Sequence, residues 1–170
     1  MPSVIRFYAR TVTALNRGLF MLSAALMAII VPAMMVEVLS RYLFHAPTVW
    51  GMELAVLLFG PYFLLGGPYL LHLGGHVNMD LFRTRMSQRI RTVADVFSQI
   101  VILFFCAVML YYATPLVLQS IEYRETTFSA WNPPLWPYKL AVPLSMLLLA
   151  LQSLAELGLI CLGDAREEIA

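Results

Sequence analysis

Four long stretches without a charged side chain limit what this chain of 170 residues can fold into more than any motif does. The stretches cover residues 18–36, 54–71, 96–121 and 140–155. At a rise of about 1.5 Å per residue, the first spans roughly 28 Å, close to the ~30 Å of a bilayer's hydrocarbon core. The chain is also 61% hydrophobic and only 12% charged, which lies outside the range of soluble domains. The sequence therefore predicts an all-α membrane protein.

The predicted architecture is one integral membrane domain over residues 1–170. Its four transmembrane helices are expected near residues 18–38, 52–72, 95–121 and 134–157. The fourth helix reaches a spanning length only if it starts near residue 134, with the long side chain of Lys139 extending toward the headgroups. The first helix is predicted to be retained rather than cleaved as a signal peptide, because its apolar run is long and no small-x-small pattern follows it.

The distribution of basic residues predicts the orientation in the membrane. Eight of the 11 lie before the first span, between the second and third spans, or after the fourth: Arg6, Arg10, Arg17, Arg83, Arg85, Arg89, Arg91 and Arg166. The other three, Arg41, Arg124 and Lys139, fall on the opposite side. Because cytoplasmic loops are enriched in basic residues, both termini are predicted to be cytoplasmic. The four arginines from Arg83 to Arg91 would keep their loop on that side.

This arginine-rich loop also carries a helical stripe of apolar residues. From Asp80, a plausible N-cap, the stripe consists of Phe82, Met86, Ile90, Val93 and Phe97. The pattern predicts an amphipathic helix at the membrane surface, with the arginines at the level of the headgroups. A solvated helix that simply extends the third span is an equally open alternative.

The segment 124–138 carries three prolines and four aromatic residues, so it is not expected to form regular helix. Trp131, Trp136 and Tyr138 suit an aromatic belt at the outer leaflet, and a docking surface for a partner is compatible with that interpretation. Within the second span, the sequence Gly66-Gly67-Pro68 indicates a kinked helix whose glycines let a neighbouring backbone approach. A broken transporter helix is disfavoured, because no internal repeat is present.

Charged residues near the outer end of the first two spans form a second candidate cluster. Glu37 and Arg41 are four residues apart and share a helix face, and Glu53 begins the next span. Arg41 is positioned to clamp one or both glutamates and so to join the two helices. Alternatively, each side chain lies independently at the headgroups.

No span carries an acid, a base or a histidine near its middle, which argues against a transport pathway through this chain alone. His72 and His76 have a spacing that suits a metal or one haem ligand, but His45 falls in the opposite loop and only Asp80 is near. Cys106 and Cys161 form no C-x-x-C pair. We therefore predict no metal, no cofactor and no enzyme activity. The alternative is a haem-binding four-helix anchor of an electron-transfer complex.

Several short motifs, in this order and spacing, resemble the small membrane subunit of tripartite ATP-independent periplasmic (TRAP) transporters, the DctQ-like family. They are Arg41-Tyr42-Leu43-Phe44-His45-Ala46-Pro47, then Trp50 and Glu53, then Gly74-Gly75-His76-Val77-Asn78-Met79-Asp80, and finally Asn132-Pro133-Pro134-Leu135-Trp136-Pro137 before Pro143. The chain departs from the family pattern at Met52, often an acid, and at Asn78, often basic.

The resemblance implies an accessory subunit in the bacterial inner membrane. A periplasmic substrate-binding protein would capture an organic acid, and a large multi-span permease subunit would carry it across with an ion gradient. The small subunit would brace the large one in the lipid bilayer. Candidate interface or structural residues are Glu37, Arg41, Trp50, Glu53, Gly66, Gly67, His76 and Asp80. The segment 131–138 would lie where the binding protein docks. The substrate and the coupling ion are left open, because specificity would reside in the other subunits.

Overall fold

The computed structural model of the protein describes residues 2–73 and 88–162. These residues form four helices: α1 (Pro2–Leu43), α2 (Gly51–His72), α4 (Gln88–Glu122) and α5 (Trp136–Leu162). All four are long and apolar enough to cross a membrane. The predicted all-α fold with four spanning helices is therefore confirmed, while the cytoplasmic location of the termini stays a prediction.

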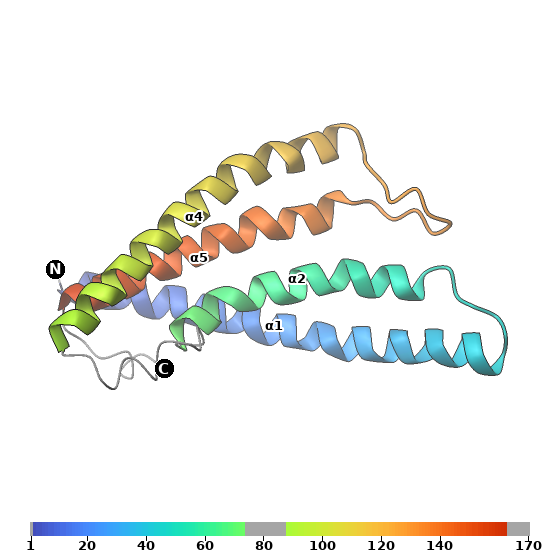
Figure 1. Ribbon diagram of the computed structural model, residues 1–170, viewed down its shortest axis with the longest axis horizontal. Coiled ribbons are helices and arrows are strands. Elements are labelled where there is room, and N and C mark those ends of the chain that lie inside the picture. The colour runs from blue at the N-terminus through green and yellow to red at the C-terminus, as the bar shows by residue number, and fades with distance from the viewer. Residues whose placement is uncertain (1, 74–87, 163–170) are drawn as a thin grey trace.

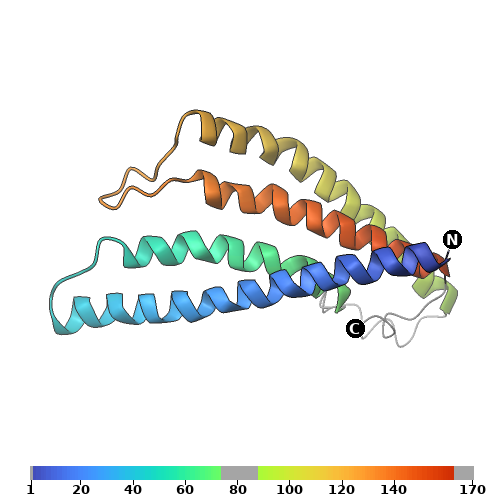
Figure 2. The same ribbon diagram turned by 180° about the vertical axis from the view of Figure 1, so that it is seen from behind.

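The helices form two antiparallel hairpins, α1 with α2 and α4 with α5 (Figure 1). α5 packs against all three other helices, and α1 also packs along α2. α1 begins and α5 ends at the same end of the bundle, which we call the terminal end. The opposite end, with the connections 44–50 and 123–135, is the loop end. Both views show the two hairpins close together at the terminal end and diverging toward the loop end (Figures 1 and 2).

Two helices are longer than the uncharged stretches indicated. α1 has 42 residues, about 63 Å, and α4 has 35 residues, about 52 Å, so both exceed the ~30 Å hydrocarbon thickness. α1 already begins at Pro2, a position where proline is tolerated because the first helical N–H has no intrahelical partner. An uncharged stretch marks only the part of a helix that suits lipid. It therefore could not show that α1 and α4 continue as helix past residues 18–36 and 96–121 into charged sequence.

α2 is a single helix of 22 residues that continues through Pro61 and Pro68. The alternative of a broken helix at these positions is therefore wrong. Gly66 is buried beside the Phe20 and Ser23 side chains of α1, where a small residue lets the two helices approach.

The connection between α2 and α4 was predicted to carry an amphipathic helix that begins at Asp80. Residues 80–87 of that prediction lie outside the described residues. From Gln88 onward the chain belongs to α4, so residues 88–95 extend the third spanning helix, with Arg89 and Arg91 exposed.

The expected non-helical segment 124–138 is non-helical only up to Leu135. Trp136, Pro137 and Tyr138 form the first turn of α5, so the prediction is wrong for these three residues. The first turn of a helix accepts proline, because the missing N–H would have no partner there. Lys139 lies in the next turn and pairs with Glu125 across the connection.

The bundle interior is small and partly polar. Its apolar cluster consists of Ala9, Ala155 and Leu159, with Tyr8 packed against it. The Tyr8 hydroxyl donates to the Leu151 carbonyl at 3.1 Å and so joins α1 to α5. Large apolar side chains such as Phe104 face outward, as expected for a bundle surrounded by lipid.

Candidate functional site

The candidate site is a polar network buried at the terminal end of the bundle, built around α5. Gln152, Ser153 and Glu156 are fully buried on this helix. Gln152 and Glu156 are four residues apart and therefore share one helix face. In lipid, a helix gains by turning such side chains toward other helices, since hydrocarbon offers no hydrogen-bond partner. The polar face of α5 consequently points into the protein.

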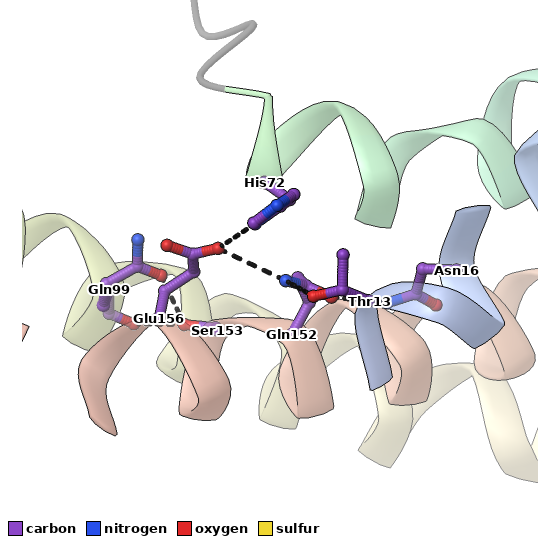
Figure 3. Close-up of polar contacts among 7 residues, drawn as sticks. All are labelled: Thr13, Asn16, His72, Gln99, Gln152, Ser153 and Glu156. Atoms are coloured by element: carbon purple, nitrogen blue, oxygen red, sulfur yellow. Dashed lines mark hydrogen bonds and ion pairs between the residues drawn. The ribbon is translucent and has the colours of Figure 1, made fainter. Parts of the chain in front are cut away.

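Glu156 is the central member of this network (Figure 3). Its Oε1 lies 2.7 Å from Nδ1 of His72, the last residue of α2, and 3.3 Å from Nε2 of Gln152. His72 is only 4% exposed, so the contact is shielded from water. When His72 carries a proton on Nδ1, both neighbours donate to the same carboxylate oxygen, and such charge-assisted bonds are the stronger kind.

Gln152 extends the network to α1 (Figure 3). Its Nε2 donates to Thr13 Oγ1 at 3.2 Å, and its Oε1 accepts from Asn16 Nδ2 at 2.8 Å. Thr13 and Asn16 are both buried. Asn16 Oδ1 is a buried acceptor without a hydrogen-bond partner among the described residues. One amide side chain thus connects α1 with the His72–Glu156 contact.

Ser153 connects α5 with α4. Its hydroxyl lies 2.7 Å from the side-chain Oε1 of Gln99 and 3.2 Å from the Gln99 carbonyl oxygen. Gln99 is 2% exposed. Through Gln152, Ser153 and Glu156, α5 is therefore hydrogen-bonded to each of the other three described helices. The arrangement suits fixed helix packing, because most of its polar groups bond to one another.

The sequence reasoning missed the partner of His72. It placed His72 with His76 and Asp80, and both of these lie outside the described residues. It also overlooked Glu156, because this residue follows the uncharged stretch by one position. The available signal was the spacing of Ser145, Gln152, Ser153 and Glu156, which puts four polar residues on one side of an otherwise apolar helix. Glu156 lies near the end of α5, away from the middle of the span, but it is fully buried inside the bundle.

The network contains two side chains of the types that bind metal ions, His72 and Glu156. Across residues 2–73 and 88–162, no three His, Cys, Asp or Glu side chains gather as a metal site would require.

A second polar cluster joins α1 and α2 at the loop end. Glu37 is 2% exposed and forms an ion pair with Arg41. Its other carboxylate oxygen accepts from the Thr48 backbone N–H at 3.0 Å and from the Thr48 hydroxyl. The Gly51 N–H donates to that same hydroxyl at 3.2 Å. The predicted pairing of Arg41 with Glu37 is present, but both residues lie on α1. The link to α2 is therefore made by Glu37 through Thr48 and not by Arg41.

Glu53, the other carboxylate considered for that clamp, has a different neighbour. Its Oε2 accepts from the Ser129 hydroxyl at 2.6 Å, which links α2 to the connection 123–135. Among the described residues, the loop end is therefore held within the first hairpin by Glu37, within the second by the pair of Glu125 and Lys139, and between the hairpins by Glu53 and Ser129.

The remaining predicted residues are spread over the surface. Trp50 occupies the N-cap position of α2, and Trp131 and Trp136 are also exposed, while Tyr138 is half-buried. Gly67 lies next to Gly66, but a Cβ placed on it would meet no other group. Arg83 and Arg85 lie outside the described residues.

Four apolar helices that turn polar side chains inward define a multi-pass integral membrane protein. The sequence matches the family described as tripartite ATP-independent periplasmic transporters, DctQ component, over residues 30–161. The chain belongs to this family. It is therefore a DctQ-type small permease component of a TRAP transporter in the bacterial inner membrane, and this family is a class of transporter component rather than of enzymes.

One relative is the sialic acid TRAP transporter permease protein SiaT of Haemophilus influenzae (strain 86-028NP). The two sequences are 36% identical over 70 residues, which is 41% of this chain. The same stretch is only 11% of that relative's length, so most of the relative has no counterpart in the match.

Proposed function

We propose that this protein is an accessory subunit that braces the large permease subunit of a TRAP transporter for organic acids and helps dock the periplasmic substrate-binding protein. Sialic acid, named for the SiaT relative, is one candidate substrate.

The bracing role is supported by how the bundle uses its polar groups. Glu156, Gln152 and Ser153 bond to side chains of the neighbouring helices. A transport pathway instead needs polar groups that are available to the solute and near the middle of the membrane. Internal bonding of this kind favours a rigid body, which a moving transport domain needs as a support.

One outward face of α2 is the proposed contact with the large subunit. Gly60 and Gly67 are seven residues apart on this helix, and a Cβ on either would meet nothing within 4 Å among residues 2–73 and 88–162. Glycine is unfavourable in a helix interior, so it is expected where a close neighbour requires a small residue. Neither Gly60 nor Gly67 has such a neighbour among the described residues, so packing within the bundle does not explain them. Phe63, on the same side, is 68% exposed and stacks on Phe59. Small residues beside aromatic rings suit close packing of a partner's transmembrane helix.

The proposed orientation puts the terminal end in the cytoplasm and the loop end in the periplasm, following the positive-inside rule. The loop end would then present Trp131 and Trp136 to the compartment of the binding protein. A rim that combines aromatic anchors with polar groups suits protein contacts.

The test is transport by the large subunit in liposomes, with and without this chain, at saturating binding protein. We expect the large subunit to co-purify with this chain and to lose most uptake without it. Full uptake by the large subunit alone would contradict the bracing role. A variant that carries the exposed change Glu122→Gln at the end of α4 is the matched control and should restore uptake as the wild type does.

A further inference from the structure

The connection 123–135 is a short, stiff hairpin rather than a loose loop. Thr126 and Pro134 form an antiparallel bridge. The Thr127 N–H donates to the Pro133 carbonyl at 3.2 Å, and the Leu135 N–H donates to the Glu125 carbonyl at 2.9 Å. Backbone bonds on both sides of the bridge fix the path of the chain up to the tip.

The tip of this hairpin is tied to α2. The Ser129 hydroxyl donates to Glu53 Oε2 at 2.6 Å and accepts from the Asn132 N–H at 2.9 Å. The Thr127 hydroxyl lies 3.0 Å from it as well. The tip is therefore held in place relative to the helices, and its immediate surroundings are hydroxyl, amide and carboxylate groups.

Phe128 projects from this polar tip. Its side chain is 93% exposed, the largest value among the large apolar side chains of the described residues. Its φ is 54°, in the left-handed region that a bulky side chain rarely adopts. Glycine or asparagine would fit this backbone better, so neither packing nor turn geometry explains a phenylalanine here.

We infer that Phe128 is an anchor for a soluble protein partner on the loop side of the membrane. The partner is the substrate-binding protein, so the inference rests on the proposed function. A lipid contact is disfavoured, because the polar groups that hold the tip would lose water in hydrocarbon. A rigid aromatic side chain on a pre-formed hairpin loses little conformational freedom when it enters a partner's pocket. Trp131, two residues beyond Ser129 and partly exposed, extends the same contact.

The substitution Phe128→Gly separates this role from a structural one. If the Phe128 side chain stabilised the fold, its removal would lower the unfolding temperature; if it binds a partner, its removal weakens that binding without lowering the unfolding temperature. Glycine relieves the left-handed backbone, so the unfolding temperature of the purified complex should stay the same or rise. The loss of the ring should weaken capture of the binding protein. In liposomes with the large subunit, we expect the half-saturating concentration of the binding protein to rise about tenfold or more. Phe128→Trp should keep a value near that of the wild type.

Tyr123→Ser is the matched control, since Tyr123 is a 72% exposed aromatic residue at the base of the same connection. It should leave the half-saturating concentration unchanged. If Phe128→Gly behaves like the wild type while uptake still depends on the binding protein, the inference is wrong and the proposed function stands. If wild-type uptake needs no binding protein, both fail together.

A spin label at Phe128→Cys distinguishes water from lipid, in a chain that also carries Cys106→Ala and Cys161→Ser. We expect the label to be more accessible to a water-soluble nickel complex than to oxygen, and addition of the binding protein should protect it. A label that is immersed in lipid would overturn the inference.

Discussion

Nδ1 of His72 lies 2.7 Å from Oε1 of Glu156, and this contact joins the last residue of α2 to the last turns of α5. Both side chains are almost fully buried in a bundle that otherwise meets lipid with apolar groups. Ionisable residues at such positions are costly unless they are paired. The pair therefore fixes how the two helical hairpins meet at the terminal end.

Removing Glu156 should destabilise the bundle without changing its fold. We expect Glu156→Ala to lower the free energy of unfolding by roughly 1–3 kcal/mol, because His72 and Gln152 would each lose a buried partner. A double-mutant cycle with His72→Ala, measured by unfolding in mixed micelles, should give a coupling energy of about 0.6–1.7 kcal/mol. Additive single effects would show that the two side chains do not stabilise each other.

Much of this architecture follows directly from the sequence. Spans of uncharged residues predict four helices because lipid accepts only apolar side chains over its thickness. The pair of His72 and Glu156 was not predictable in the same way. The two residues are 84 positions apart, and periodicity gives the face of a helix but not the neighbour that this face meets. The contact of Ser129 with Glu53 also depends on how the two hairpins pack.

Two glycines of α2 should respond in opposite ways to the same substitution. A Cβ on Gly51 would lie 2.7 Å from Thr48 Oγ1 and 3.0 Å from Glu37 Cβ, so Gly51→Ala should displace Thr48 and lower the unfolding temperature. A Cβ on Gly60 meets nothing, so Gly60→Ala should stabilise the isolated protein by about 0.5–1 kcal/mol through helix propensity. Thermal unfolding in detergent compares the two, and a stable Gly51→Ala variant would contradict the tight packing at Thr48.

A larger side chain should separate contacts within the bundle from contacts with the large subunit. Gly66→Leu would push against Phe20 and Ser23 of α1, so we expect it to destabilise the isolated chain. A Cβ on Gly67 meets nothing within 4 Å among the described residues, so Gly67→Leu should not destabilise the isolated chain, but it should reduce the yield of co-purified large subunit. Normal co-purification of Gly67→Leu would exclude this face of α2 from the proposed interface.

The pairing of Glu125 with Lys139 should make the loop end sensitive to acid. The side-chain hydrogen bond from Lys139 holds the pKa of Glu125 below its usual value of 4.5, since it favours the charged carboxylate. A lowered folded-state pKa means that the pair contributes stability above about pH 4.5 and loses it as the pH falls through the lowered pKa. Thermal unfolding of the wild type and of Glu125→Gln, from about pH 6 to about pH 3, should therefore show a wild-type advantage that disappears at the acidic end. Both side chains are about one-third exposed, so salt should also reduce the advantage. A difference between the two proteins that stays constant over this range would mean that the ion pair is not its source.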